Sequence, residues 1–395
     1  MEYKLSIIIP TRNRQIYAAN VVNNLIKHAP NSQIIINDNS DDGSLRNMLT
    51  CIDSKNLLYS YFPGNMSVIE NFENALSKAD GEYVTIIGDD DYVGPKIEEI
   101  VDQAIKQDID SISLKKNRAI HYFWPDCISK NWRNIGGKFF FSDFTSKAKK
   151  LSIDSEISLV QSRLGSGPLG LPRIYLGIVS MKLIKKIVKK HGNIFGGVSP
   201  DVYSSVLIAK ESLNPIVYDF PFIIPGACPE STSAARANKS DIGSGTVSKN
   251  HLSRFKEINW DPRVPEVYTP ITVWALTTIQ ALKLYGITPK LSSYSYLYAS
   301  CLAWYFKKTF NEVLDSFLTY NFLQKVIILA LIIIYLPFIY INYFISKIPL
   351  LLRPRPGAAK FFCQNLESIV EAYKVLEQKY KDNEINLDLR NHNNK

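Results

Sequence analysis

The chain has 395 residues, of which 46% are apolar and 21% are charged, and its formal net charge is +9. This composition excludes a disordered protein and supports a large core divided into two or more domains. The five cysteines lie far apart, which excludes a disulfide scaffold and a cysteine-based zinc site. The basic residues are scattered and flank a late apolar segment, so we expect a membrane-facing surface and no nucleic acid partner. The chain begins without the long apolar run of a secretory signal, which indicates a cytoplasmic location.

Strand and helix patterns alternate over the first hundred residues. This alternation predicts an α/β fold with a Rossmann-like, mainly parallel sheet that helices cover on both faces. Ligands of such sheets bind at the carboxyl ends of the strands, so the polar turns at 10–14, 37–44 and 88–91 are expected to converge. The runs predicted to form buried strands are 5–9, 33–36, 57–62 and 83–87.

Three consecutive carboxylates, Asp89, Asp90 and Asp91, follow the fourth strand. Carboxylates so close together repel one another, and a divalent cation removes the conflict. Mg²⁺ and Mn²⁺ take oxygen ligands, often one or two carboxylates together with substrate phosphates, so Asp89 and Asp91 are candidate metal ligands. The alternative is a solvated acidic turn that favours the start of the next helix, which Pro95 opens.

The other two turns are polar as well. Asp38, at the tip of the second strand, is a candidate to accept a hydrogen bond from the imide N–H of uracil or thymine. Thr11, Arg12 and Asn13 line the same cleft, and a nucleotide diphosphate bridged by metal to the acidic triplet fits between them. Alternatively, Asp38 forms an Asx turn, and Arg12 and Arg14 are solvated surface residues.

The order and spacing of these motifs resemble family 2 glycosyltransferases of the A-type fold. The resemblance covers about the first hundred residues. It rests on Ser-Ile-Ile-Ile-Pro-Thr-Arg-Asn-Arg at 6–14, Ile-Ile-Ile-Asn-Asp-Asn-Ser-Asp-Asp-Gly-Ser at 34–44, residues 71–75, and Gly-Glu-Tyr at 81–83 leading into the acidic triplet.

This resemblance implies roles for single residues. Asp38 would bind the base, Asp89 and Asp90 would lie near the ribose and diphosphate, and Asp91 would ligate the metal. Asn39 stands where many relatives carry a second Asp. The nucleotide-binding residues that we expect are Pro10, Thr11, Arg12, Asn13, Asp38, Asn39, Asp89 and Asp90.

A candidate general base lies far downstream. Ser199 suits a helix N-cap and Pro200 the first helical position, which places Asp201 in the first turn. Helix capping alone explains this pattern; the functional alternative is that Asp201 accepts the proton of the attacking sugar hydroxyl. Because family 2 members are inverting enzymes with an acidic base after the metal motif, the resemblance favours Asp201 as the catalytic residue, with Glu211 or Asp219 as alternatives.

The middle of the chain has weaker patterns. Between residues 109 and 173, aromatic and basic residues such as 122–124, Trp132 and Arg133 are expected to face the acceptor, either stacked on sugars or simply packed. The glycine-rich stretch 165–170 lacks the ending of a phosphate loop and is interpreted as a flexible connection. Residues 225–260 are predicted to be a mobile lid or a linker.

A late apolar segment predicts membrane association. Residues 326–346 carry no charge and are long enough to span a bilayer, a buried core helix being the alternative. Basic residues flank both ends, so the positive-inside rule selects no orientation. Pro337 and Pro349 are expected to interrupt the helix, which favours a re-entrant or in-plane hairpin over a span. We expect the cytoplasmic face of a bacterial membrane.

The C-terminal tail has a heptad-like pattern. Its apolar residues predict an amphipathic helix that either forms a homodimer or packs on its own domain. Residues 382–395 are expected to be disordered. The apolar positions are Phe362, Leu366, Ile369, Tyr373, Leu376 and Tyr380.

These patterns divide the chain into five expected regions. We expect an inverting hexosyl- or N-acetylhexosaminyltransferase that depends on Mn²⁺ or Mg²⁺. Its donor would be a UDP-sugar, or another nucleotide-diphosphate sugar, and its acceptor a hydroxyl of a glycan or lipid-linked glycan. The expected setting is bacterial surface polysaccharide assembly, such as capsule or lipopolysaccharide. The alternatives are a sugar-phosphate nucleotidylyltransferase and an inactive membrane-tethered glycan-binding or scaffold protein. The regions are a nucleotide-sugar-binding half (1–110), an acceptor-binding half (111–230), a loop and helical region (231–322), a membrane-associated segment (323–352) and an amphipathic helix with a disordered tail (353–395).

Overall fold

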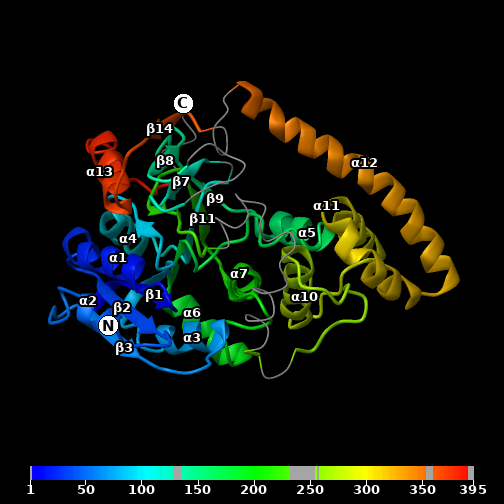
Figure 1. Ribbon diagram of the computed structural model, residues 1–395, viewed down its shortest axis with the longest axis horizontal. Helices are drawn as coiled ribbons and strands as arrows, with labels where there is room; N and C mark the ends of the chain where they lie inside the picture. The colour runs from blue at the N-terminus through cyan, green and yellow to red at the C-terminus, as the bar shows by residue number, and fades with distance from the viewer. Residues whose placement is uncertain are drawn as a thin grey trace.

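An eight-stranded mixed sheet forms the centre of the computed structural model, which describes residues 2–116, 118–127, 135–231, 254–255, 258–352 and 359–389 (Figure 1). The pairs β1–β2, β1–β4, β2–β3 and β6–β11 are parallel, whereas β10 and β9 run antiparallel to their neighbours. The predicted mainly parallel sheet is therefore confirmed. Across the sheet the strands are β3 (Leu57–Tyr61), β2 (Gln33–Asp38), β1 (Tyr3–Thr11), β4 (Gly81–Ile86), β10 (Gly177–Ser180), β6 (Ser111–Leu114), β11 (Pro215–Tyr218) and β9 (Ala148–Lys150).

The sheet is buried on both faces, as the unbroken apolar runs of its strands predict. Successive residues of a strand point to opposite faces. Ile7 and Ile9 accordingly join one hydrophobic cluster while Ile8 joins another. The first cluster is covered by α1 (Gln15–His28), α2 (Leu45–Met48) and α4 (Ile97–Lys106), and the second by α3 (Val68–Leu76), α5 (Ile153–Ser162), α6 (Met181–His191) and α7 (Pro200–Glu211).

A second, four-stranded sheet lies beside the first. Of the two alternatives for the aromatic residues 122–124, simple packing holds: the exposed fractions of Tyr122, Phe123 and Trp124 are 0%, 5% and 4%. Trp132 and Arg133 lie outside the described residues. The strands are β13 (Gly226–Ala227), β7 (Ile120–Phe123), β8 (Lys138–Phe141) and β14 (Phe361–Cys363), and a small ladder joins β12 (Ile223–Ile224) to β5 (Tyr92–Val93).

Three long helices, α10 (Pro270–Lys283), α11 (Leu291–Leu318) and α12 (Phe322–Leu352), share a third hydrophobic cluster. Helix α12 runs along the outer edge of the molecule (Figure 1). The predicted interruptions at Pro337 and Pro349 are wrong, because α12 continues through both prolines. Ile332 and Ile339 are buried on either side of Pro337, and this packing outweighs the one hydrogen bond that a proline removes.

The C-terminal part folds back onto the first cluster. The predicted long amphipathic helix is shorter than expected: Phe361–Cys363 forms β14 and only Ile369–Lys379 is helical (α13). Ile369, Tyr373 and Leu376 are buried in the core of their own chain, so of the two alternatives the helix packs on its own domain.

The end of the chain differs from the expected disorder. Ile385 and Leu387 are only 9% and 0% exposed and belong to the core. The burial of these two apolar side chains anchors an otherwise polar tail. Residues 390–395 lie outside the described part of the chain.

Candidate active site

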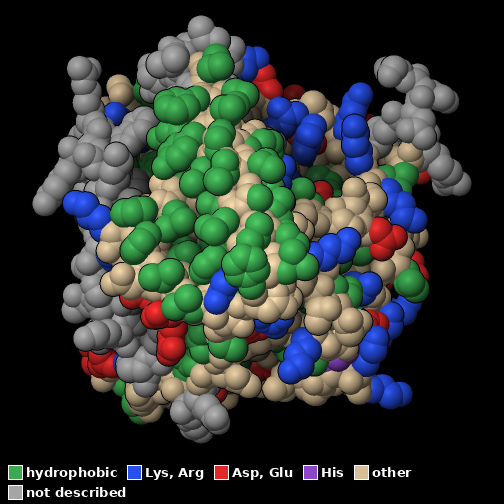
Figure 2. Space-filling view, turned by 90° about the vertical axis from the view of Figure 1, so that its right-hand side faces the viewer, with side chains coloured by type: hydrophobic (Ala, Val, Ile, Leu, Met, Phe, Trp, Pro, Cys, Tyr) green, Lys and Arg blue, Asp and Glu red, His purple; other side chains and the backbone are tan. Residues whose placement is uncertain are grey.

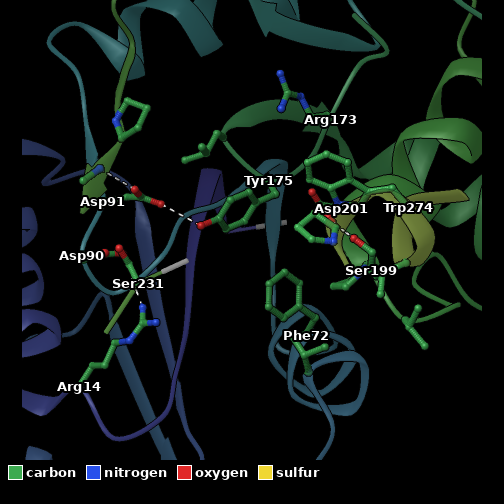
Figure 3. Close-up of a pocket in the computed structure, with 18 of the residues that line it drawn as sticks. Arg14, Phe72, Asp90, Asp91, Arg173, Tyr175, Ser199, Asp201, Ser231 and Trp274 are labelled. Carbon is green, nitrogen blue, oxygen red and sulfur yellow. Dashed lines mark hydrogen bonds and ion pairs between the residues drawn. The ribbon is translucent and has the colours of Figure 1, made fainter. Parts of the chain in front are cut away.

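A pocket of about 620 Å³ opens where β1 and β4 end. Asp90 and Asp91 lie at one end of this pocket and the first turn of α7 at the other (Figure 3). Tyr175 and Phe72 lie between the two ends. The polar residues that line the pocket include Arg14, Asp90 and Asp91 at the first end and Arg173, Ser199 and Asp201 at the second, where Trp274 forms part of the wall.

Asp89 is tied to the turn that follows β1. Its carboxylate accepts a hydrogen bond of 2.6 Å from the Thr11 hydroxyl and one of 2.9 Å from Arg14 Nη1. The side chain is nearly fully buried, and Arg14 lines the pocket beside it. Asp89, predicted as a nucleotide and metal ligand, therefore joins two loops, and its two carboxylate oxygens both have partners.

Asp91, the other predicted metal ligand, is held by three donors. Its Oδ2 accepts from the Gly88 amide at 2.8 Å and the Tyr175 hydroxyl at 3.0 Å, and its Oδ1 accepts from the Gly226 amide at 2.7 Å. Burial raises the pKa of Asp91, although these donors stabilise its charge. Its carboxylate thus links three segments of the chain.

Asp90 has the least engaged carboxylate of the triplet. Oδ2 accepts from the Cys228 amide at 2.9 Å, while Oδ1 lies 3.8 Å from Arg14. Burial and repulsion from Asp91 and Asp89 raise the pKa of Asp90 to about 7. This residue lines the pocket, so of the three carboxylates it has the most room for a further partner.

The described residues contain no group of three or more His, Cys, Asp or Glu side chains arranged to hold a metal ion. The acidic triplet has instead a protein cation beside it. Arg14 contacts Asp89, and its Nη2 also donates to the Glu230 carbonyl at 3.0 Å. Burial opposes the charge of Arg14, but Asp89 and Asp90 raise its pKa above the ordinary value. Sequence reasoning did not select Arg14, although it belongs to the polar turn after β1.

Asp38, predicted to bind the base, is completely buried. Its Oδ1 accepts from the Ser40 amide at 2.9 Å, which is the geometry of an Asx turn, and its Oδ2 accepts from the Tyr59 hydroxyl at 2.9 Å. Burial and the hydrogen bond to Asp38 raise the pKa of Tyr59. The carboxylate keeps spare acceptor capacity, because each oxygen accepts more than one hydrogen bond.

The remaining predicted nucleotide residues join the turns after β1 and β2. Pro10 pairs with Asn37 in the parallel ladder. Arg12 donates to Asn39 Oδ1 at 2.8 Å, and the backbone amide of Asn13 donates to the Ser40 hydroxyl at 2.8 Å. These residues thus form a hydrogen-bonded network at the carboxyl edge of the sheet, next to the pocket end that holds the triplet.

Asp201 lies in the first turn of α7, as its sequence context predicts, and lines the pocket. Ser199 donates a hydrogen bond of 2.6 Å from its hydroxyl to Asp201 Oδ1. The side chain of Ser199 makes no capping bond to the helix, so this hydroxyl orients the carboxylate.

The two alternative bases lie in ion-pair networks away from the pocket. Glu211 contacts Lys190 and Lys186; burial opposes its charge, but these lysines lower its pKa to about 2. Asp219 contacts Lys115 at 3.1 Å and Arg118 at 2.6 Å. Among the three candidates, Asp201 is the one that lines the pocket.

Tyr175 and Arg173 enter the pocket from a segment without periodic sequence pattern. The segment is fixed to the end of β4, because the Ile86 amide donates to the Ile174 carbonyl at 3.0 Å and the Leu176 amide donates to the Ile86 carbonyl at 2.9 Å. Sequence reasoning missed both residues. The only available signal was their position shortly before a strand.

A mainly parallel sheet binds its ligands at the carboxyl ends of its strands, and the pocket lies at this edge. Residues 6–145 match the model of glycosyl transferase family 2. This part of the chain is therefore a family 2 glycosyltransferase domain, and the predicted A-type glycosyltransferase fold is confirmed.

Individual relatives cover parts of the chain. An uncharacterised glycosyltransferase, MG060, of Mycoplasma genitalium is 34% identical over 118 residues. The aligned part covers 28% of this chain and 40% of that relative.

Among solved structures, the chain is similar to S. aureus TarS. TarS 1–349 in complex with UDP-GlcNAc is 15% identical with a TM-score of 0.44, and the match covers 96% of this chain and 91% of that one. TarS 1–349 alone is 17% identical with a TM-score of 0.43, covering 79% and 88%.

Proposed function

We propose that this protein is an inverting, metal-dependent glycosyltransferase that moves a sugar from a UDP-sugar, or another nucleotide-diphosphate sugar, to a hydroxyl of a glycan or lipid-linked glycan. The observation that carries this proposal is that Asp90 and Asp201 line opposite ends of one pocket in a chain with a family 2 domain. A donor diphosphate at the first end and an acceptor hydroxyl at the second would meet between them.

The donor nucleotide is proposed to lie over the turns that follow β1 and β2. Asp38 would accept from the imide N–H of the base through its spare acceptor capacity. The hydrogen-bonded network around it supports this placement, because a cross-linked edge holds its polar groups in fixed positions. The proposed nucleotide contacts are Pro10, Thr11, Arg12, Asn13, Asp38, Asn39, Asp89 and Asp90.

We propose that a divalent cation, Mn²⁺ or Mg²⁺, binds the triplet beside Asp90. Its Oδ1 lies 3.8 Å from Arg14, and its ionised form is disfavoured by burial and by its acidic neighbours. We propose that Asp90 joins the two predicted ligands, Asp89 and Asp91, in holding the cation, with phosphate oxygens as further ligands. The cation would supply charge neutralisation for the leaving diphosphate.

Asp201 is proposed as the general base. Ser199 donates to its Oδ1, which leaves Oδ2 to accept the proton of the acceptor hydroxyl. As the oxygen of the acceptor hydroxyl bonds to the anomeric carbon from the side opposite the diphosphate, the bond between that carbon and the diphosphate breaks. The configuration at the anomeric carbon therefore inverts.

We further propose that the protein associates with the cytoplasmic face of a bacterial membrane and serves surface polysaccharide assembly, such as capsule or lipopolysaccharide. The segment Phe322–Ser346 has a mean hydropathy of 2.4, and most of its apolar stretch is not buried inside the protein. Figure 2 shows the apolar side chains of the outer helix as a band, with Lys and Arg side chains beside it. An exposed apolar band flanked by basic groups suits an anionic bilayer surface.

Thermal stability with a panel of nucleotide sugars, followed by substitution of the proposed general base Asp201, tests the proposal. We expect a UDP-sugar with Mn²⁺ to raise the melting temperature of the protein, because a ligand of the folded state stabilises it. Asp201→Asn should keep this shift and lose sugar transfer into bacterial membrane extract by about 100-fold or more. The charge-matched control, Glu211→Gln, should transfer at the rate of the wild type.

Two results contradict the proposal at different points. If no nucleotide sugar shifts the melting temperature, the donor assignment fails and the inactive binding or scaffold protein is favoured. If Asp201→Asn turns over normally, the base assignment fails.

A further inference from the structure

Arg173 is a second arginine in the pocket, and its surroundings differ from those of Arg14. Within the described parts of the chain, its guanidinium makes no hydrogen bond and no ion pair, whereas Arg14 contacts both Asp89 and a carbonyl. Burial lowers the pKa of Arg173, and the charge of Asp201 offsets this only in part. A half-buried guanidinium without hydrogen-bond acceptors is costly, so this position is suited to an anionic ligand.

The backbone presents Arg173 rigidly. It lies between Leu171 and Ile174, both of which are fully buried. Gly177 permits the close approach of this turn, because a Cβ there would lie 2.1 Å from the Arg173 carbonyl oxygen. The arginine is thus held in place before any ligand arrives, which reduces the entropy lost on binding.

Arg173 lies at the acceptor end of the pocket. Figure 3 shows it on the side of Asp201 and Trp274, across Tyr175 from the acidic triplet. The donor diphosphate would be neutralised at the triplet end, where Arg14 lies and where the proposed cation would bind. The anion that Arg173 meets therefore belongs to the other ligand.

The same segment connects the pocket to the apolar hairpin of α11 and α12. It begins near Arg163, whose guanidinium carbon lies 6.0 Å from the centre of the Phe338 ring on α12. Gly167 packs beneath Trp274, where a Cβ would lie 3.2 Å from the indole ring. An acceptor that approaches from the hairpin side would reach Trp274 and Arg173 before it reaches the triplet.

We propose that Arg173 binds a phosphate group of the acceptor, close to the hydroxyl that Asp201 deprotonates. This inference rests on the proposed function. A guanidinium binds phosphate through two parallel hydrogen bonds, so it fixes both the position and the orientation of the acceptor. The phosphate belongs either to a lipid headgroup or to a soluble sugar phosphate, and both present the same chemistry to Arg173.

The test measures acceptor binding separately from donor binding. Full-length protein in non-ionic detergent, saturated with UDP and Mn²⁺, is titrated calorimetrically with farnesyl phosphate, farnesol, glucose 1-phosphate and glucose. We expect the phosphate forms to bind and the alcohol and sugar without phosphate to bind more weakly. Arg173→Gln should weaken phosphate binding by about tenfold or more, Arg173→Lys should restore part of it, and UDP affinity should stay unchanged in both variants.

Arg163→Gln is the matched control, because it removes an exposed arginine of the same segment that does not line the pocket. Preferential binding of farnesyl phosphate identifies a lipid headgroup as the source, and equal binding of glucose 1-phosphate identifies a soluble phosphate; both support the inference.

Three results overturn the inference while UDP still binds. The first is a phosphate affinity of Arg173→Gln equal to that of the wild type. The second is a parallel loss of UDP affinity in Arg173→Gln, which would make Arg173 a donor contact. The third is that the wild type binds no phosphate. If UDP itself does not bind the wild type, the proposed function fails as well.

Discussion

At the scale of single residues, the acidic triplet shows how neighbours of one type acquire different environments. Asp89 is bonded to Thr11 and Arg14, and Asp91 accepts three hydrogen bonds. Asp90 accepts from the Cys228 amide, and its other oxygen lies 3.8 Å from Arg14. The charge of the triplet was evident from the sequence, but the distribution of its partners depends on loops far away in the chain.

The raised pKa of Asp90 predicts a pH dependence of stability. Because this pKa is about 7 in the folded protein and near 3.8 ordinarily, the folded state binds the proton more tightly between these values. Asp90 therefore adds to the free energy of unfolding at low pH, and this contribution decreases as the pH rises toward 7. We expect Asp90→Asn, which cannot ionise, to gain stability relative to the wild type from pH 5 to pH 8, measured by urea unfolding without metal.

The same variant provides the control for cation binding. Mn²⁺ at pH 8 should stabilise the wild type more than Asp90→Asn, because the cation compensates the ionised carboxylate. If the stability difference between the two proteins is independent of pH, the pKa of Asp90 is not raised in the folded protein.

At the scale of elements, two segments that follow the first hundred residues complete the triplet. Strand β13 donates the Gly226 amide to Asp91, and it lies so close that a Cβ at Gly226 would be 1.7 Å from the Asp90 carbonyl oxygen. The segment before β10 donates the Tyr175 hydroxyl to the same carboxylate. The site thus forms only when these elements pack on the ends of β1 and β4.

Removal of the Tyr175 hydroxyl tests this coupling. Tyr175→Phe should lower the free energy of unfolding by about 1–3 kcal/mol, because a buried carboxylate loses one of its donors. Tyr203→Phe is the matched control: within the described residues the Tyr203 hydroxyl makes no hydrogen bond. Chemical denaturation of both variants gives the comparison, and equal losses would mean that the bond to Asp91 adds nothing.

At the scale of the whole molecule, α10 connects the pocket to the apolar hairpin. Val273 and Trp274 on α10 line the pocket, and Val273 also belongs, with Leu276 and Ile279, to the cluster that α11 and α12 share. One helix therefore contacts both the proposed active site and the hairpin that carries the proposed membrane surface. This arrangement suits an acceptor that is held at a membrane.

A charge on the outer face of α12 tests the membrane association. Ile333 is 70% exposed within the apolar band, and Leu213 is 81% exposed elsewhere on the surface. Ile333→Lys should weaken binding to vesicles of phosphatidylethanolamine and phosphatidylglycerol by about tenfold or more, because a charge in the hydrocarbon region is costly. Leu213→Lys should float with the vesicles as the wild type does, and equal flotation of both variants would argue against α12 as the membrane contact.

Much of the fold follows from local patterns. The strands that begin at Tyr3, Gln33, Leu57 and Gly81 were predicted because apolar residues recur at short spacing, and turns between them are marked by polar residues. Asp201 was placed in the first turn of a helix by Ser199 and Pro200. The C-terminal region was predicted less well, since Ile385 and Leu387 are too few to give a periodic signal.

The sequence by itself determined the alternating α/β order, the family resemblance, the acidic triplet and the apolar helix, because each of these is a local pattern of side chains. Only the tertiary structure decided that Asp90 and Asp91 line the pocket while Asp89 does not, and that Tyr175 and Arg173 belong to it. Those residues come from segments without periodicity, and their positions depend on packing between elements that are more than eighty residues apart, such as Tyr175 and Asp91.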